Sequence, residues 1–352
     1  MEFVTAKGVI KALISPVVDM FGIYDALLAR RVFGKSNWLI LMYHRIINQP
    51  SEDPFRLGMC VDRAHFAEQL DFLTQRFTPI TVEDAVQRIR HGRPLPRNTL
   101  SVTFDDGYRD FVNLAMPVLG RYNCPATIYV STGGIQENRH FWWDRVIASF
   151  ANTRSKHLDL EIPDVRGHSD SLHLGFSGRR RALLRTLDML WDQPAAQIDP
   201  LVSLIEAVLG APENCLGAER LTLEKISLLD QDAVEIAVHC DAHADLTRMQ
   251  PDEVLRDIAK SRRCLEEAAG RRLQGFAYPG GRQNNPVRQI VSRAGFSYAA
   301  GTEKGLNRKP FEAFNLRRIG MPNTSIADFK RCLSVAAGGE ARTVSGESVQ
   351  WP

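Results

Sequence analysis

The chain has 352 residues, enough for one large α/β domain with additions or for two smaller domains. Its 44 Lys and Arg residues against 41 Asp and Glu residues give a formal net charge of +3, which is too balanced to indicate nucleic acid as a partner. The six cysteines form no Cys-x-x-Cys pair, so redox or zinc-finger chemistry is not indicated and a reducing compartment is favoured.

The N-terminal segment, residues 1–36, is predicted to be amphipathic and helical. Charged residues and Pro16 interrupt its apolar positions, so no run approaches the roughly 18 apolar residues of a membrane-spanning helix. The charge pattern does not fit a secretory signal either. Two alternatives stay open for residues 1–31, contact with a membrane surface and packing on the body of the protein. We expect a cytoplasmic protein, peripheral to the inner membrane face if the first alternative holds.

The next part of the chain alternates between strand and helix. Compact or alternating apolar runs predict buried strands, and apolar residues at helical spacing predict the helices between them. This order is typical of parallel strands joined by crossover helices. The expected strands are 38–44, 100–104 and 126–131, and the expected helices are 62–77, 81–92 and 110–119.

Between residues 134 and 229 the alternation of strand and helix stops. We predict a mainly helical insertion here, with helices over 179–191 and 198–209. Near its start, Trp142 and Trp143 could stack on sugar rings or could pack the insertion onto the body, and both interpretations stay open. The basic run at 178–181 is more typical of a solvated helix face than of a phosphate site.

Two adjacent carboxylates, Asp105 and Asp106, end the strand at 100–104, and Gly107 permits a tight turn after them. Ligands bind at the carboxyl edge of parallel strands, and two neighbouring carboxylates can divide the work of binding a metal and moving a proton. Because Asp-Asp-Gly is also an ordinary solvated turn, this motif alone leaves both interpretations open.

Another apolar strand, 234–238, ends at His239, and His243 follows four positions later. If residues 240–243 turn helically, the two imidazoles face the same side and can bind one metal. A His-x-x-x-His pair is a weak signal by itself, so this prediction depends on the motifs around it.

A further strand end leads from Tyr278 into Pro279, Gly280 and Gly281, a tight turn whose amides can face a ligand. The strand and helix alternation continues after it, and residues 338–352 are predicted to be a disordered tail. The remaining expected helices are 251–269 and 287–294, and the remaining expected strands are 296–300 and 316–321.

Together these motifs resemble those of the polysaccharide deacetylase family, the NodB-homology group also called carbohydrate esterase family 4. They are Thr-Phe-Asp-Asp-Gly at 103–107, His-x-x-x-His at 239–243 and Tyr-Pro-Gly-Gly at 278–281, in that order. The resemblance runs over about residues 38–336 and implies an α/β fold, a deformed (β/α) barrel with fewer than eight units. We expect the domain at 37–337, interrupted by the insertion at 134–229.

The resemblance also implies a divalent metal, most commonly zinc, bound by Asp106, His239 and His243, with Asp105 as the general base. Such a donor set leaves positions on the metal open for water and substrate. Backbone amides of the turn that begins at Tyr278 are expected to stabilise an oxyanion. The expected substrate-binding residues are Tyr108, Trp142, Trp143, Tyr278, Pro279, Gly280 and Arg318.

The sequence departs from the common family pattern in three respects, of which one, Cys240 in place of the usual Ser or Thr after the first histidine, is expected to have little effect. No histidine follows His243, so the late motif histidine that serves as general acid in many members is missing. The early Leu-Met-Tyr-His at 41–44 resembles the exopolysaccharide branch, which acts on poly-N-acetylglucosamine, and this implies that His44 is the acid. Ala277 stands where many members have an arginine that orients the base, and Arg317 or Arg318 is expected to replace it.

The function implied by the resemblance is metal-dependent removal of N-acetyl groups from amino sugars in a polysaccharide, a glycan precursor or a glycolipid-linked sugar. Two alternatives remain at this point. A carbohydrate-binding pseudoenzyme would keep the barrel without turnover, although binding alone needs no set of two carboxylates and two histidines. An amidohydrolase acting on a non-sugar amide would use the same chemistry on another substrate.

Overall fold

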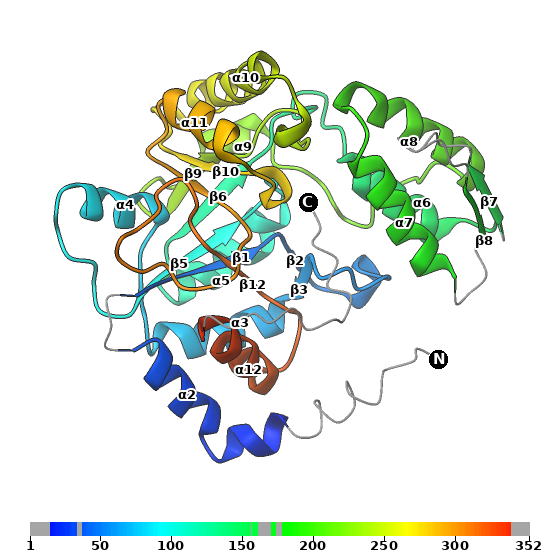
Figure 1. Cartoon of the computed structure of the whole chain (residues 1–352). Helices are drawn as coiled ribbons and strands as arrows, with labels where there is room; N and C mark the ends of the chain where they lie inside the picture. The colour runs from blue at the N-terminus through cyan, green and yellow to red at the C-terminus, as the bar shows by residue number, and fades with distance from the viewer. Residues whose placement is uncertain (1–14, 34–36, 156, 161–169, 174–177, 339–352) are drawn as a thin grey trace.

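The computed structural model describes residues 15–33, 37–155, 157–160, 170–173 and 178–338 (Figure 1). Residues 1–14 of the predicted N-terminal segment, and the predicted tail beyond residue 338, lie outside the described residues. Eight parallel strands form the main sheet, in the order β11-β10-β9-β6-β5-β1-β12 with β4 also paired to β5. Its strands are β1 (Trp38–Tyr43), β4 (Thr78–Pro79), β5 (Thr99–Phe104), β6 (Ala126–Val130), β9 (Val234–Val238), β10 (Gly275–Ala277), β11 (Tyr298–Ala300) and β12 (Ile319–Gly320).

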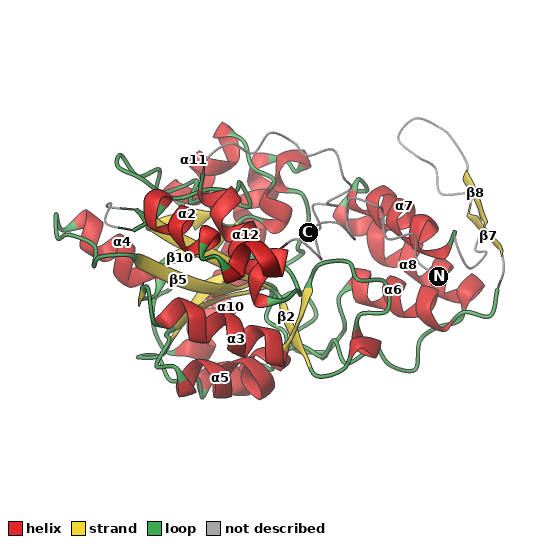
Figure 2. Ribbon diagram, turned by 90° about the horizontal axis from the view of Figure 1, so that it is seen from below, coloured by secondary structure: helices red, strands yellow, loops and turns green. Residues whose placement is uncertain are grey.

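Helices lie on both sides of this curled sheet (Figure 2). The predicted deformed (β/α) barrel is therefore confirmed. The helices that accompany the sheet are α2 (Ile23–Arg31), α3 (Arg63–Thr74), α4 (Val82–Arg90), α5 (Met116–Arg121), α9 (Leu223–Ser227), α10 (Pro251–Ala269), α11 (Asn285–Arg293) and α12 (Ile326–Ala337). A small parallel pair, β2 (Arg45–Ile47) and β3 (Cys60–Asp62), follows β1.

The gap between the edge strands β11 and β12 is bridged by the segment that connects them. Ala300 pairs with Leu316, and Trp38 of β1 exchanges backbone hydrogen bonds with Asn307. This closure brings the chain after β11 back across the open side of the barrel and leaves β12 beside β1.

Side chains alternate between the two faces of each strand, as the strand period of two requires. One set, including Leu41, Val102 and Ile236, belongs to the large core packed against the outer helices. The other set faces the barrel interior, where Trp38 and Tyr129 belong to a second core together with residues of α4. Because residues of one face recur at every second position, a strand's inward face can be followed to its carboxyl end.

The helical lobe formed by α6 (Trp142–Asn152), α7 (Arg179–Trp191) and α8 (Ala195–Leu209) stands to one side of the barrel (Figure 1). The predicted helix at 179–191 is confirmed, and α8 begins three residues before its predicted start. Helix α6 and the hairpin of β7 (His157–Leu160) and β8 (Asp170–His173) were not predicted. The lobe has its own apolar core, which also takes in Ile47 and Tyr108 of the barrel.

At the N-terminal side, α2 packs on α12, a helix that the sequence analysis missed. Lys330 contacts Asp19 and Asp25 at 3.0 Å each, and Arg31 donates to the Ser334 carbonyl at 2.7 Å. Four apolar side chains before and at the start of α2 are nevertheless exposed by 45–75%: Val17, Met20, Phe21 and Ile23. Within the described residues, no helix combines the length and the apolar character that crossing a membrane requires.

Candidate active site

The inward faces of three strands bring ionisable side chains to one end of the barrel. His44 follows β1, Asp105 follows β5 and His239 follows β9, each at an inward position of its strand. Because the strands are parallel, their carboxyl ends lie together at one rim. The structure thus assembles residues that lie far apart in the sequence.

Asp106 occupies a turn that only its tertiary surroundings support. Its φ of 74° is left-handed, a conformation that aspartate tolerates better than most side chains but that still carries strain. Gly107 follows with φ of 87°, and a Cβ there would lie 2.8 Å from Val130. The turn therefore requires glycine, and it points the Asp106 carboxylate into a fully buried position.

The loop that carries His243 is not a helical turn, which corrects our prediction for residues 240–243. Cys240 has φ of 65° and His243 has φ of 48°, so the chain bends through left-handed residues instead. Asp257 of α10 accepts hydrogen bonds from the backbone of Asp241 at 2.9 Å and of Ala242 at 2.8 Å. These contacts hold the strained loop against α10.

Asp106, His239 and His243 converge as the sequence predicts. Oδ1 of Asp106 lies 3.2 Å from Nε2 of His243 and 3.5 Å from Nε2 of His239. The two Nε2 atoms are 3.2 Å apart, and all three side chains are buried. Nδ1 of His239 lies 2.8 Å from the Ala277 carbonyl, which can only accept, so Nδ1 carries the proton and Nε2 presents its lone pair.

This donor set fits a divalent metal ion. Neither carboxylate oxygen of Asp106 has a hydrogen-bond partner among the described residues, although both are buried. A buried carboxylate with no donor is costly unless a cation offsets its charge. Two imidazoles and one carboxylate are ligands typical of zinc and related ions, so these three residues could hold a metal.

The three side chains of this cluster shift one another's pKa. Burial raises the pKa of Asp106, but the two imidazoles beside it lower it further, so that it lies well below the usual range. Burial lowers the pKa of both imidazoles. Beside Asp106 and Asp105 the net pKa shift of His239 is upward, whereas that of His243 is downward. A bound metal would displace any proton that these three side chains hold.

Asp105 is held by Arg318. The guanidinium donates two parallel hydrogen bonds to its carboxylate, at 2.6 and 2.7 Å, and a further one to the Gly301 carbonyl at 2.8 Å. Burial raises the pKa of Asp105, but Arg318 and then His239 lower it more, and the net pKa lies below the ordinary value. Arg317 instead pairs with the exposed Glu303 at 2.8 Å.

Arg318 was predicted to bind substrate, and the structure corrects this. Its side chain is completely buried and its donors are directed at Asp105, Thr103 and Gly301. Arg318 therefore contacts Asp105 as expected for the residue that replaces the arginine missing at Ala277.

His44 lies half-buried between β1 and β2, near enough to Asp105 and Asp106 for its charge to act on both carboxylates. Its place at the same rim is compatible with proton transfer at the site. Its partial exposure also distinguishes it from the fully enclosed His239 and His243.

Three predicted substrate-binding aromatics are packed rather than open. Tyr108 is fully buried, donates to Asp144 at 3.0 Å and accepts from Trp143 at 2.8 Å. The ring of Trp143 stacks on Phe141 with centroids 4.4 Å apart, and Trp142 stacks on Trp191 at 6.2 Å. Of the two interpretations of Trp142 and Trp143, the structure favours packing of the insertion onto the body, because neighbouring rings cover their faces.

Two backbone N–H groups of the turn after β10 already donate hydrogen bonds within the protein. The Tyr278 side chain is buried, and its hydroxyl donates to the Phe314 carbonyl at 3.0 Å, which corrects its predicted contact with substrate. The backbone N–H groups of Tyr278 and Gly281 donate to Ala300 and Tyr278, and Pro279 has none. Gly280, with φ of 58°, is the remaining residue of the turn whose N–H can serve a ligand.

Sequence reasoning missed two residues that support the site. Arg220 is buried, lies 4.0 Å above the ring of Phe141 and donates to the carbonyls of Ser131 and Gly133. Asp257 is the anchor of the His243 loop described above. Neither lies in a recognisable motif, and only contacts between distant segments reveal them.

A cavity of about 320 Å³ adjoins the cluster, between the rim of the barrel and the helical lobe. Its lining includes His243, Trp142 and Trp143 together with the ion pair of Arg139 and Asp199. An apolar wall with a few charged groups beside a buried ligand set is the usual setting of a small-molecule site. The fold and the site together define a class of protein: a (β/α) barrel with three residues that can hold a metal and, beside them, a carboxylate hydrogen-bonded to an arginine.

Comparison with known proteins agrees with this class. The family model described as polysaccharide deacetylase matches residues 92–157 and 217–299, on both sides of the helical lobe. The resemblance to the polysaccharide deacetylase family is therefore confirmed over these two segments, and the relatives below support the exopolysaccharide branch.

One curated relative is the poly-beta-1,6-N-acetyl-D-glucosamine N-deacetylase of Escherichia coli K12, which is 26% identical over 103 residues. That match covers 29% of this chain and 15% of the relative, so it spans only a small part of the relative's length.

Two solved structures share the fold. The deacetylase PplD of Streptococcus pyogenes, solved with acetate, has a TM-score of 0.56 at 19% identity, over 83% of this chain and 95% of that one. IcaB from Ammonifex degensii has a TM-score of 0.55 at 19% identity, over 86% of this chain and 97% of that one.

Proposed function

We propose that this chain is a metal-dependent hydrolase that removes N-acetyl groups from N-acetylated amino sugars in a polysaccharide or glycan precursor. The observation that carries the proposal is the buried ligand set of Asp106, His239 and His243 directly beside Asp105, which Arg318 holds. In this proposal the catalytic domain is 37–337, with the insertion at 134–229.

The metal in this proposal is a divalent ion, zinc by preference for two imidazoles and one carboxylate. When bound, such an ion lowers the pKa of its water and polarises the carbonyl of the acetamide. His239 is oriented for this task by its hydrogen bond to Ala277, and Asp106 by the turn at Gly107.

Asp105 acts as the general base. Arg318 lowers the pKa of this carboxylate and so keeps it ionised and able to accept a proton. Both carboxylate oxygens accept from Arg318 at 2.6 and 2.7 Å, which fixes their direction. Each oxygen retains a second lone pair for the proton of the attacking water.

Two further groups complete the chemistry. The backbone N–H of Gly280 is assigned to the oxyanion that forms when the amide carbonyl is attacked, a contribution of about 3–4 kcal/mol for a well-aimed donor. His44 is the general acid that protonates the leaving amine, because it lies at the same rim and is open to solvent in part.

The substrate class rests on the family and its relatives. The Escherichia coli relative is named for deacetylation of poly-beta-1,6-N-acetyl-D-glucosamine, and the match to the family model supports a glycan as the partner here. A glycolipid-linked amino sugar carries the same acetamide and belongs to the same proposal.

The experiment that tests the proposal combines metal content with release of acetate. We expect about one divalent ion per chain in the purified protein and acetate release from N-acetylglucosamine oligomers. His239→Ala should lose both, while His91→Ala, at the exposed end of α4, should lose neither. Full acetate release by the metal-free His239→Ala protein would refute the mechanism.

We further propose a cytoplasmic location with contact to the inner membrane face through residues 1–31. The exposed Val17, Met20, Phe21 and Ile23 support the proposal, because an apolar group of this kind can enter a lipid interface. Vesicles containing anionic lipid should sediment the protein, and Met20→Ser with Phe21→Ser should reduce this. Sedimentation that both substitutions leave unchanged would exclude this surface.

A further inference from the structure

The two imidazoles of the ligand set are held in different ways. Nδ1 of His239 donates to the Ala277 carbonyl at 2.8 Å, which fixes the direction of that ring. Nδ1 of His243 is buried too, but no other residue in the described part of the chain offers it a hydrogen bond. Histidines that bind a metal usually use this second nitrogen to fix their orientation, so the His243 ring needs another support.

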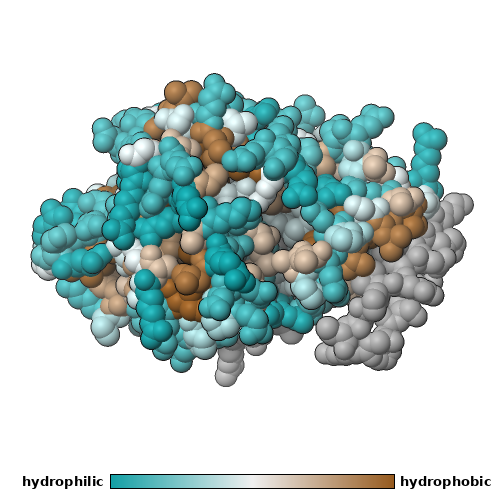
Figure 3. All heavy atoms as spheres, turned by 90° about the horizontal axis from the view of Figure 1, so that it is seen from above, coloured by the Kyte–Doolittle hydropathy of each residue, from teal (hydrophilic) through white to brown (hydrophobic). Residues whose placement is uncertain are grey.

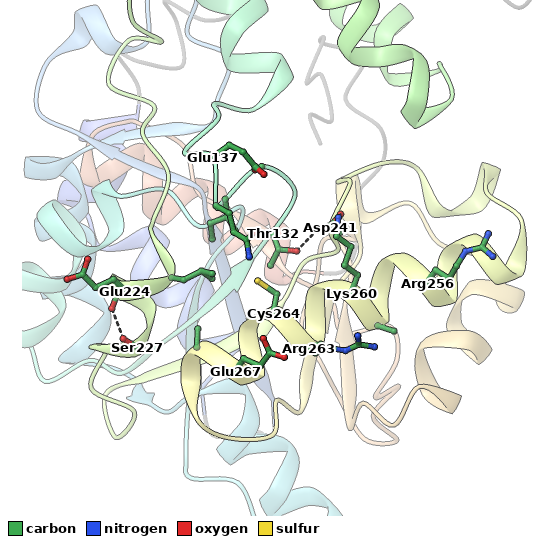
Figure 4. A pocket seen from close by; sticks show the side chains of 16 residues that line it. Thr132, Glu137, Glu224, Ser227, Asp241, Arg256, Lys260, Arg263, Cys264 and Glu267 are labelled. Atoms are coloured by element: carbon green, nitrogen blue, oxygen red, sulfur yellow. Dashed lines mark hydrogen bonds and ion pairs between the residues drawn. The ribbon is translucent and has the colours of Figure 1, made fainter.

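The backbone before His243 is anchored at Asp241. Thr132, in the segment after β6, donates to the Asp241 carboxylate at 2.8 Å, and Lys260 of α10 donates to it at 2.6 Å (Figure 4). The Gly133 N–H donates to the Asp241 carbonyl at 2.8 Å. These contacts fix the course of the loop, but they do not fix the rotation of the His243 side chain about its own bonds.

Aromatic rings of the helical lobe enclose the His243 ring. Trp143 of α6 is the nearest of them, with its ring centroid 4.5 Å from that of the imidazole. Trp191, the last residue of α7, lies at 5.8 Å, and Phe141, which precedes α6, lies at 6.1 Å. The lobe therefore supplies the side chains that can limit the rotation of His243.

Trp143 is itself held in place by two contacts. Its Nε1 donates to the Tyr108 hydroxyl at 2.8 Å, and its ring stacks on Phe141 with an interplanar angle of 9°. The guanidinium of Arg220 lies 4.0 Å from the centre of the Phe141 ring and donates to two carbonyls that follow β6. A stack of side chains therefore runs from the barrel through two aromatic rings to the imidazole of His243.

The lobe directs these aromatic side chains inward and exposes aliphatic ones. Hydrophobic side chains reach the surface of the lobe in the view of Figure 3, and Leu204 and Val208 of α8 are exposed by 47% and 41%. Phe141, Trp143 and Trp191 are exposed by only 6%, 1% and 6%. Close-packed side chains keep one orientation, so these rings form a fixed wall for the imidazole.

We propose that Trp143 is a positioning residue for His243, with Trp191 as a second support, and that the helical lobe is thereby part of the metal centre. The inference rests on the proposed function in taking His243 as a metal ligand, and it assigns the lobe a role in that site. An imidazole already held in one orientation loses less freedom when it binds a metal, so the fixed indole should raise metal affinity.

The test measures metal affinity without any substrate. The purified protein is stripped of metal and titrated with Zn²⁺ in competition with a chromogenic chelator. Trp143→Leu should raise the dissociation constant by about 10- to 100-fold, the range expected when the outer support of a ligand is removed. Trp143→Phe keeps a ring against the imidazole and should recover most of the affinity.

Ile205→Ala is the matched control. Ile205 is buried in the same lobe core, but it is not among the residues that line the cavity at His243. This change should destabilise the lobe and leave the Zn²⁺ dissociation constant unchanged. Titration with Co²⁺ gives a second readout, because its visible absorption depends on the geometry of the ligands. The absorption bands should change in Trp143→Leu and stay as in the wild type in Ile205→Ala.

The outcomes separate this inference from the proposed function. Wild-type affinity in a folded Trp143→Leu protein, or an equal loss of affinity in Ile205→Ala, would overturn the inference and leave the proposed function intact. If Trp143→Leu does not fold, Trp191→Leu decides: a raised dissociation constant supports the inference, and wild-type affinity refutes it.

Acetate release is measured separately. A wild type that binds Zn²⁺ tightly but releases no acetate would refute the proposed hydrolase, and the comparison of dissociation constants would still decide the role of Trp143. A wild type that binds neither Zn²⁺ nor Co²⁺ would refute both proposals.

Discussion

Arg318 and Asp105 are 213 residues apart in sequence and form a buried pair with two parallel hydrogen bonds, at 2.6 and 2.7 Å. The pair joins the last strand of the barrel to the end of β5, at the rim where the ligand set lies. Since Arg318 is fully buried and Asp105 almost so, neither charge can be left without the other at low cost.

Removing this arginine should move the pH dependence of activity. In Arg318→Met the carboxylate stays buried without its counter-charge, so its pKa rises from the lowered value that Arg318 maintains. A base must be ionised, so the acidic limb of the pH–rate profile should move to higher pH, and stability should fall by about 3–5 kcal/mol. Profiles of kcat/KM and thermal unfolding measure both effects.

Arg318→Lys is the matched control for that change. It keeps the charge but offers a single ammonium in place of the planar fork, so we expect a smaller shift and a smaller loss of stability. An acidic limb that stays in place in both folded variants would remove Arg318 from the mechanism.

Asp105→Asn should separate metal binding from catalysis. Asp106, His239 and His243 remain, so metal content should match the wild type, whereas turnover should fall by about 100-fold or more with loss of the base. Elemental analysis and acetate release measure the two quantities. Asp192→Asn, at a half-exposed surface position, should change neither. Turnover near the wild-type rate would show that another group takes the proton.

His44→Ala should change the alkaline limb of the pH–rate profile. A general acid must be protonated to donate, so its loss should flatten the alkaline limb of the pH–rate profile and leave metal content unchanged. His91→Ala, at the exposed end of α4, is the control. If the alkaline limb persists in His44→Ala, His44 has a structural role only.

Glu235 should make stability depend on pH. It lies inside the barrel and accepts from Thr127 at 2.7 Å, from the Glu83 backbone at 2.8 Å and from Tyr298. Burial nevertheless raises its pKa from 4.5 to about 7, against the opposing effect of Tyr298 and Thr127. The folded state therefore binds more protons than the unfolded state between these values, so the free energy of unfolding falls as pH rises through this window, by up to about 3 kcal/mol.

Glu235→Gln should remove that slope. Urea unfolding at about pH 5 and about pH 8 measures it in the wild type and in the variant. Glu312→Gln, an exposed carboxylate, should keep the wild-type slope. Equal slopes in wild type and Glu235→Gln would show that Glu235 is ionised throughout this range.

The alternation of apolar residues determined much of the fold. It predicted strands at 38–44 and 100–104, and β1 and β5 cover these runs within one residue. It also predicted the carboxyl-end positions of Asp105 and His239, because the strand period and parallel pairing are local and topological rules. The convergence of Asp106, His239 and His243 followed from three motifs in one order.

Tertiary contacts decided what the pattern could not. The neighbouring sequence does not show whether Trp142 and Trp143 face solvent. In the structure Trp191 stacks on Trp142 and Phe141 stacks on Trp143. The four-residue spacing of the histidines fits a helical turn, yet Asp257 and the left-handed Cys240 hold a loop instead. Burial depends on which distant segments cover a residue, and spacing does not record that.

The sequence by itself therefore determined the barrel, its rim and the set of ionisable residues at the rim, because the hydrophobic period and the order of strands and helices are patterns of neighbouring residues. It left Arg317 and Arg318 equal as candidates to orient Asp105. Only the tertiary structure separated them, since these adjacent residues just before β12 face opposite sides, and Arg318 alone turns inward to the barrel and the carboxylate.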